Sequence, residues 1–294
     1  MRTEPNRVDF DSAGGLVVAA YRWQRANAPR AIVQITHGGG EHALRYAHLA
    51  GALTDEGYVV YAQDHRGHGN TAASEAELGL LGGDGWAELV RDIDRLRLQA
   101  RGEHPSIPLV LIGHSMGSHA VQQYLLDHSD DVTAVVLTAT GALDLLEPYV
   151  DLDQPIDPAM INAAFAPART DYDWISRDED QVDRYIVDPR CGFRLDSAGN
   201  KAMFLAARQM ADPDRLANIR KNLPVYIAVG EEDPAHGQLA LVNALVARLQ
   251  SAGLHDVTLK IYPGARHEVF NEINRDEVYA DLITWMNDTV HQAG

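Results

Sequence analysis

The sequence predicts an α/β fold in which a mostly parallel sheet is flanked by helices and carries a helical cap insertion. Three observations predict it. Short apolar runs alternate with amphipathic stretches along most of the 294 residues. The alternation stops between about residues 141 and 223 and then resumes. Residues 113–117 read Gly-His-Ser-Met-Gly and join an apolar run to a helix-like stretch. We therefore expect residues 1–140 and 224–294 to form one core, and residues 141–223 to form the cap.

The order of the core elements follows from local sequence patterns. Residues 16–22 come after two glycines, and we expect them to pair with residues 8–10 as an antiparallel edge of the sheet. Farther along the chain, helices separate most successive strands, which implies parallel strands with right-handed crossovers. The further predicted strands are residues 31–36, 58–62, 109–112, 132–137, 224–230 and 257–262, and the predicted helices are residues 44–53, 86–100, 118–128, 238–249 and 276–290.

The insertion has a different character from the core. It is rich in proline and in acidic residues, and its apolar residues suit short helices rather than a sheet strand. It also follows directly after a predicted strand. An insertion at that end of an open sheet is most simply a cap that forms part of the substrate pocket.

Composition excludes several classes of protein. Hydrophobic residues make up 46% of the chain and charged residues 23%, which are ordinary values for a globular protein. A net charge of −17 argues against binding to nucleic acid or to anionic lipid, because both need clustered Lys and Arg. The N-terminus carries no apolar run, and no stretch reaches the length of a membrane span. We expect a cytoplasmic protein without a transmembrane anchor, whose oligomeric state the sequence leaves open.

The sequence offers little that would hold a metal. Cys191 is the only cysteine, so an internal disulfide is excluded, and we interpret this residue as a packing residue. His65 and His68 lie in a Gly-rich loop, but no third ligand follows at a suitable spacing, which favours a structural role for both. We therefore expect neither a metal nor an organic cofactor.

Ser115 is the candidate nucleophile. It lies at the centre of a G-x-S-x-G pattern, directly after the apolar run 109–112 and before a helix. A strand that turns sharply into a helix exposes the residue at the turn, and the flanking glycines allow strand and helix to approach closely. The free N–H groups at the start of that helix suit a developing oxyanion. The alternative is an ordinary turn serine between two glycines.

A second Gly-rich loop follows the strand 31–36. Residues 37–42 read His-Gly-Gly-Gly-Glu-His, and successive glycines let backbone N–H groups face a ligand. We expect the N–H groups of Gly39 and Met116 to form an oxyanion hole. The alternative is a flexible connector.

A serine nucleophile needs a base and an acid, and each is expected just beyond a strand. Asp233 follows the strand 224–230, and His267 follows the last predicted strand. The resulting order Ser, Asp, His is the one that the α/β-hydrolase fold uses. Glu231 and Glu232 compete for the acid position, and the alternative for His267 is a surface loop histidine.

The chain resembles the bacterial monoacylglycerol lipase and lysophospholipase group of α/β-hydrolases. The segments that carry the resemblance are residues 37–42 with Arg45 and Tyr46, residues 64–69, 113–117 and 264–268, and, in the insertion, residues 172–178 and 188–193. The resemblance implies a serine ester hydrolase that cleaves small-molecule monoacyl esters, of the monoacylglycerol or lysophospholipid type. It also implies that Glu41 and Arg45 face the alcohol side of the pocket; a salt bridge that braces the loop is an equal alternative.

Two differences from this group leave other substrate classes as alternatives. Phe270 stands where some monoacylglycerol lipases have a second histidine, and the cap is acidic, which would repel anionic bilayers. The alternative is a specialised carboxylesterase for small or aromatic esters such as phthalate monoesters. Relatives of this fold also cleave amides and N-terminal peptide bonds. A non-catalytic ligand-binding protein and a haloperoxidase-like activity are the remaining alternatives.

Overall fold

A computed structural model describes residues 4–154 and 158–292. Residues 155–157 of the predicted cap, and residues 1–3 and 293–294 of the predicted core, lie outside the described residues. The described part contains an eight-stranded sheet with the strand order β1-β4-β6-β5-β7-β8-β9-β10 and a separate pair, β2-β3. The six strands from β6 to β10 in this order run parallel, and β1 and β4 form the antiparallel edge. The predicted fold class is confirmed.

The described elements have the following bounds. The strands are β1 Asn6–Arg7, β2 Phe10–Asp11, β3 Val17–Val18, β4 Ala20–Trp23, β5 Ile32–Thr36, β6 Val59–Gln63, β7 Leu109–His114, β8 Ala134–Thr138, β9 Val225–Gly230 and β10 Val257–Tyr262. The helices are α1 Ala47–Asp55, α2 Gly85–Glu103, α3 Met116–His128, α4 Pro158–Asn162, α5 Glu179–Val187, α6 Ser197–Ala207, α7 Pro213–Leu216, α8 Ala240–Ser251 and α9 Arg275–Gln292.

Three sequence predictions need correction in detail. The predicted helix 44–53 begins as α1 only at Ala47, because residues Ala43–Tyr46 form a separate 3-10 helix. The predicted strand 16–22 is two strands, β3 and β4, because the backbone of Ala19 between them bonds to the loop after β6: its N–H donates to Thr71 Oγ1 and its carbonyl accepts from Asp64 N–H. Helix α8 begins two residues later than predicted, because Gln238 and Leu239 have φ angles of 53° and 68°. A left-handed backbone of this kind is incompatible with the first turn of an α-helix.

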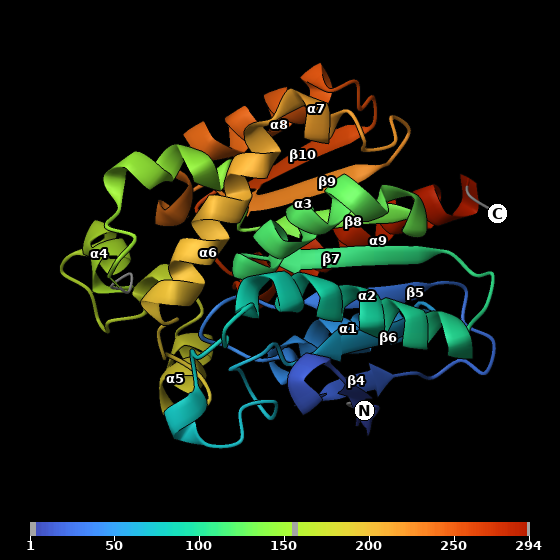
Figure 1. Cartoon of the computed structure of the whole chain (residues 1–294), viewed down its shortest axis with the longest axis horizontal. Helices are drawn as coiled ribbons and strands as arrows, with labels where there is room; N and C mark the ends of the chain where they lie inside the picture. Colours follow the sequence, from blue (N-terminus) through green and yellow to red (C-terminus); the bar gives the residue numbers. More distant parts are fainter. Residues whose placement is uncertain (1–3, 155–157, 293–294) are drawn as a thin grey trace.

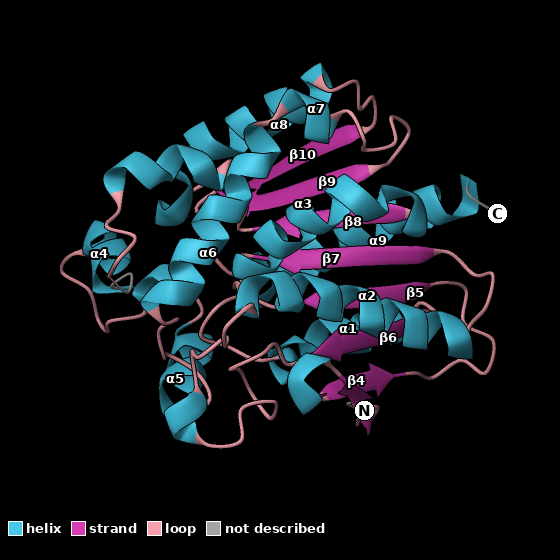
Figure 2. Ribbon diagram, in the orientation of Figure 1, coloured by secondary structure: helices cyan, strands magenta, loops and turns pink. Residues whose placement is uncertain are grey.

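The sheet separates two hydrophobic cores. Successive strand residues point to opposite faces, so in β7 Leu109 and Leu111 pack in one core and Val110 and Ile112 in the other. Apolar side chains of α2, α3 and α8 complete the first core, and those of α1 and α9 complete the second. Helices therefore cover both faces of the sheet (Figure 2).

The insertion lies beyond the carboxyl ends of the parallel strands. In Figure 1, the arrowheads of β6 and β7 point toward the side of the molecule that carries α4, α5 and α6. Strand β5 has β6 on one side and β7 on the other, so successive strands are added first on one side of β5 and then on the other. Ligands of open α/β sheets bind at such a switch point, which places the predicted site between the core and the insertion. Within the described residues, no helix is both long enough and apolar enough to cross a membrane.

Candidate active site

Ser115 occupies the sharp turn between β7 and α3. Its backbone has φ 51° and ψ −121°, a conformation that L-residues rarely adopt. The flanking glycines make the turn possible, since a Cβ on Gly117 would meet Thr36 O at 2.2 Å and one on Gly113 would meet Gly117 O at 2.8 Å. Helix α3 starts at the next residue, so the positive end of its dipole lies at the Ser115 side chain.

Ser115, His267 and Asp233 form one hydrogen-bonded chain. The Ser115 hydroxyl lies 2.9 Å from His267 Nε2, and His267 Nδ1–H donates to Asp233 Oδ2 at 2.9 Å. Asp233 is 2% exposed and His267 is 5% exposed. Glu231 and Glu232, the competitors for the acid position, are both exposed. The structure therefore brings the three predicted side chains together in the arrangement that activates a serine.

The charges around His267 favour its protonated form. Burial lowers the pKa of the imidazole, but the Asp233 carboxylate and its hydrogen bond raise it, as do Glu268 and Glu41, and the net pKa lies above the ordinary value of 6.5. Burial raises the pKa of the Asp233 carboxyl, but His267 lowers it to a net value below the ordinary one. An imidazolium that forms during proton transfer would therefore be stabilised in place.

The loop of residues 37–42, here called the glycine loop, lies against Ser115. A Cβ on Gly38 would meet Ser115 Cβ at 3.2 Å, and one on Gly39 would meet Cβ and Sδ of Met116 at 3.7 Å. The backbones of Gly39 and Met116, the predicted oxyanion donors, are thus neighbours beside the hydroxyl. Both residues line the same cavity as Ser115. Gly38 N–H donates to the side chain of Glu41 at 2.7 Å, which fixes the start of the loop.

Glu41 and Arg45 belong to a buried ion-pair network. Arg45 donates to Glu41 Oε2 at 2.7 Å and to both oxygens of Glu268 at 2.6 and 2.7 Å, and the Tyr46 hydroxyl donates to Glu41 at 2.8 Å. Neither Glu41 nor Arg45 is among the described residues that line the cavity. These contacts favour the bracing role of the two residues, and their alcohol-binding role stays a prediction. Phe270, also outside that lining, is buried against Tyr279.

A cavity of about 770 Å³ opens at Ser115 and His267. Most of its wall is apolar and comes from the insertion, which contributes Leu146, Val150, Met160 and Phe193 among others. Cavities of this size and character bind small organic ligands. The cavity therefore suits an acyl chain or another apolar group attached to a carbonyl at Ser115.

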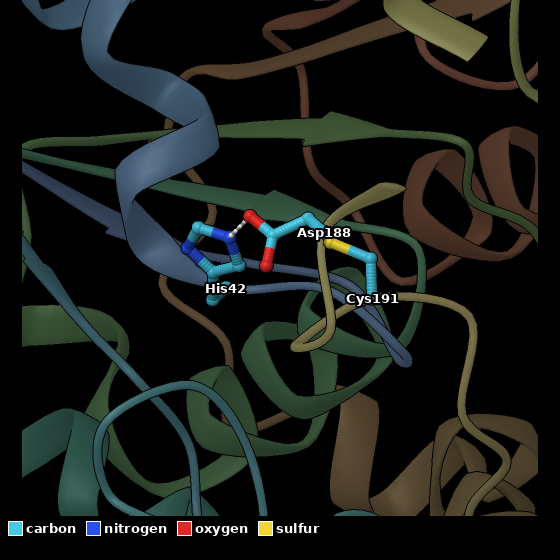
Figure 3. Close-up of side chains that lie close together, drawn as sticks. All are labelled: His42, Asp188 and Cys191. Carbon is cyan, nitrogen blue, oxygen red and sulfur yellow. Dashed lines mark hydrogen bonds and ion pairs between the residues drawn. The ribbon is translucent and has the colours of Figure 1, made fainter. Parts of the chain in front are cut away.

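Two groups of metal-ligand side chains occur among the described residues. His42, Asp188 and Cys191 hold their ligand atoms within 4.8 Å of one another (Figure 3). Both oxygens of Asp188 already accept hydrogen bonds from Arg190, and one also accepts from His42 Nε2–H at 3.0 Å. The second group is Asp94, His128 and Asp131. Because Arg190 already neutralises Asp188, we interpret the first group as a contact between the glycine loop and the insertion, and the absence of a metal stays a prediction.

His65 and His68 serve the loops around the site. His65 Nε2 lies 3.2 Å from His37 O, and His68 Nδ1 lies 2.8 Å from Arg66 O. Burial lowers the pKa of His65 to about 3 and that of His68 to about 4, so both rings are neutral donors near pH 7. These contacts support the structural role predicted for the two residues.

Three residues near the site have no role in the sequence predictions. Glu268 bonds to Arg45, and the Trp174 ring lies 4.7 Å from the His267 ring, centroid to centroid, while its carbonyl accepts from His267 N–H at 3.4 Å. The Tyr185 hydroxyl donates to the carbonyl of Gly40 at 2.8 Å. Of the three, only Glu268 could have been noticed in the sequence, because it is a charged residue between His267 and the apolar pair Val269 and Phe270.

Comparison with solved structures identifies the fold. The structure of a highly thermostable carboxyl esterase from Bacillus coagulans, in complex with glycerol, matches with a TM-score of 0.86 and 29% identity over 97% of this chain and 99% of that chain. A lipase in an open form matches with a TM-score of 0.83 and 28% identity over 98% and 99% of the two chains. The fold is therefore that of the α/β-hydrolases.

The sequence comparisons are more specific than the fold. A family profile described as "Serine aminopeptidase, S33" matches residues 27–274, and the chain belongs to this family. The chain is homologous to monoacylglycerol lipases, and that of Mycolicibacterium smegmatis is 31% identical over 94% of this chain and 95% of the relative. The protein is a carboxylic ester hydrolase of the lipase and esterase class.

Proposed function

We propose that the protein hydrolyses monoacyl esters, of the monoacylglycerol or lysophospholipid type, through an acyl-enzyme on Ser115. The observation that carries the proposal is the hydrogen-bonded chain Ser115–His267–Asp233 at the wall of an apolar cavity. A monoacyl ester has one apolar chain and one polar alcohol. The apolar wall suits the chain.

The proposed roles of Ser115, His267 and Asp233 follow from their hydrogen bonds. Ser115 Oγ attacks the ester carbonyl carbon while His267 Nε2 takes the hydroxyl proton, and Asp233 holds the imidazole tautomer. The N–H groups of Gly39 and Met116 bind the oxyanion, and each such donor contributes about 3 to 4 kcal/mol to transition-state stabilisation. The carbon–oxygen bond to the alcohol then breaks, and His267 returns the proton to the leaving alcohol. Water repeats the sequence on the acyl-enzyme, and a carboxylic acid leaves.

The same proposal assigns residues 141–223 to a cap. Its described part supplies most of the apolar cavity wall and contributes no strand to the sheet. The names of the relatives support a glycerol ester, since one is a monoacylglycerol lipase and another is an esterase that binds glycerol.

Small or aromatic esters are the second candidate, and one observation favours them. Glu41 and Arg45 lie in an ion-pair network with Glu268 and are absent from the described cavity lining. A glycerol-type alcohol would therefore lack the polar partners that the family resemblance implies. The cytoplasmic location expected from the sequence remains a prediction.

A hydrolysis panel tests the proposal. It contains p-nitrophenyl esters from C2 to C12, a monoacylglycerol, lysophosphatidylcholine, a monoalkyl phthalate and an aminoacyl p-nitroanilide, each run with the wild type and with Ser115→Ala. We expect a preference for the monoacylglycerol or lysophospholipid, and a loss of activity in the variant of at least about 10⁴-fold. A preference for the phthalate or short esters would move the substrate class to the second candidate. Undiminished hydrolysis by a pure variant would contradict the mechanism.

A further inference from the structure

The insertion touches the glycine loop at its far end. The carbonyl of Gly40 accepts two hydrogen bonds from the insertion, from Gly192 N–H at 3.0 Å and from the Tyr185 hydroxyl at 2.8 Å. Gly40 has a φ of 68°, and a Cβ there would meet Phe193 O at 2.8 Å. The insertion backbone therefore lies directly against this glycine, and its two donors fix the direction of the Gly40 carbonyl.

Two further contacts extend this interface. His42 Nε2–H donates to Asp188 Oδ2 at 3.0 Å, and Figure 3 marks this contact with a dashed line. The Arg45 guanidinium lies 4.8 Å from the centroid of the Tyr185 ring, a distance at which cation–π attraction operates. His42 is 3% exposed, so its contact with Asp188 is shielded from water on the side of the core. The segment 185–193 thus holds the second half of the glycine loop and the residues that follow it.

The core holds the first half of the loop. His65 N–H donates to His37 Nε2 at 3.0 Å, and Gly38 N–H donates at 2.7 Å to Glu41 Oε1, the oxygen that also accepts from the Tyr46 hydroxyl at 2.8 Å. Gly39 lies between the two anchored halves. Its N–H donates no hydrogen bond to any residue of the described chain, which leaves it free for a ligand. The position of this N–H is therefore set by the core on one side and by the insertion on the other.

We propose that segment 185–193 of the insertion positions the oxyanion hole, with Tyr185 as the positioning residue that acts through Gly40. The inference rests on the proposed function, because it assumes that Gly39 N–H binds the oxyanion. A hole that is preorganised in this way loses transition-state stabilisation when its donor shifts, whereas substrate binding changes little. The cap would then serve the chemical step as well as the substrate pocket.

The test variant is Tyr185→Phe, which removes the hydroxyl and keeps the ring on the cavity wall. We expect kcat to fall about 10-fold and KM to stay within about twofold, since a small misplacement of a catalytic group acts on the transition state. Affinity for a trifluoromethyl ketone, which forms a tetrahedral adduct on Ser115, should fall by a similar factor. The control is Tyr58→Phe: Tyr58 directly precedes β6, and its hydroxyl donates at 2.7 Å to Asn287 of α9, away from the site. It should leave both quantities unchanged.

Asp188→Ala provides a second variant in case Tyr185→Phe does not fold. It removes the contact with His42, and we expect the same pattern with a smaller factor of about threefold. Unchanged kcat and unchanged ketone affinity in both folded variants would overturn the positioning role, as would an effect confined to KM. If Ser115→Ala stays active in the same assay, the proposed function fails instead. The two failures are therefore distinguishable.

Discussion

The insertion contains two stretches that are attached to the core in different ways. The inner stretch, residues 172–193, bonds to the glycine loop through Tyr185 and Asp188, and to the loop after β10 through its backbone, since Ile175 O accepts from Glu268 N–H at 2.7 Å. The outer stretch, residues 143–166, is joined to the core by an ion pair between Asp144 and Arg248 of α8.

The outer stretch is not bonded to the two loops that the inner stretch contacts. Its described residues, 143–154 and 158–166, make no hydrogen bond or ion pair to the glycine loop or to the loop after β10, although Phe165 lies under the Arg266 guanidinium at 4.1 Å. Its apolar side chains line the cavity instead. The comparison shows that one insertion combines a part that bonds to the loops beside Ser115 and His267 with a part that lines the cavity. Substitutions in the first should change turnover, and substitutions in the second should change substrate range.

The largest expected effect concerns Glu272, which joins the inner stretch to the loop after β10. This carboxylate is fully buried and accepts from the backbone N–H and Nε of Arg177 and from Arg266 N–H at 2.9 to 3.0 Å. Glu272→Ala should lower the free energy of unfolding by about 3 kcal/mol, because it leaves buried donors without an acceptor. It should also lower kcat by at least about 10-fold, since the loop carries His267.

The matched control for Glu272 is Glu147→Ala in the outer stretch. Glu147 pairs with Arg208 at the surface, and such pairs contribute little to stability. Urea unfolding and steady-state kinetics of both variants give the comparison. Equal losses of kcat in the two variants would show that the inner stretch has no special relation to the site.

An intermediate effect is expected on the pH profile. The base must be neutral to accept the Ser115 proton, so kcat/KM should rise with pH through the pKa of His267, which lies above 6.5, and should fall about tenfold per pH unit below it. Glu268→Gln removes a negative charge that raises this pKa, so the midpoint should move to lower pH. Asp151→Asn in the outer stretch is the control and should leave the midpoint in place. A profile that is flat from pH 5 to 9 would contradict His267 as the base.

The smallest effect is expected in the outer stretch itself. Leu146 lines the cavity, and Leu146→Trp should shorten the space for an acyl chain. We expect kcat/KM for a C12 p-nitrophenyl ester to fall about 10-fold relative to a C4 ester, since a few methylenes in an apolar pocket carry that much discrimination. The value for the C4 ester should stay within about twofold of wild type. A parallel loss for both esters would assign the outer stretch to the chemistry rather than to the pocket.

Much of the fold was predictable because local patterns carry it. The strand β10 has the bounds that its apolar run predicts, and the other parallel strands shift by one or two residues at their ends. The predicted element boundaries are wrong where long-range contacts or an unusual backbone conformation determine where an element begins or ends. Ala19 interrupts the edge strand because its partners lie in the loop after β6, and Leu239 delays α8 because its φ is positive without a glycine to signal it.

Those site residues that directly follow a strand could be predicted from the sequence. Ser115, Asp233 and His267 each come after a parallel strand, so the sheet brings them together, and their catalytic roles remain proposals. The surroundings of Arg45 were not predictable, because its partner Glu268 lies 223 positions away in the chain.

The neighbours of Cys191 could not be predicted from the sequence either. It reads as an isolated packing residue in the sequence, and only the folded insertion places it beside His42 and Asp188.

The backbone conformation at Ser115 lowers the stability of this protein. A non-glycine residue held at φ 51° and ψ −121° costs of the order of 1 to 3 kcal/mol, and the rest of the fold must compensate for it permanently. Engineering that selects for thermal stability alone would therefore favour sequences that relax this turn. Such sequences would also withdraw the hydroxyl from the cavity. Useful stabilisation should instead be sought at the end of the sheet opposite the insertion, where added rigidity does not affect the site.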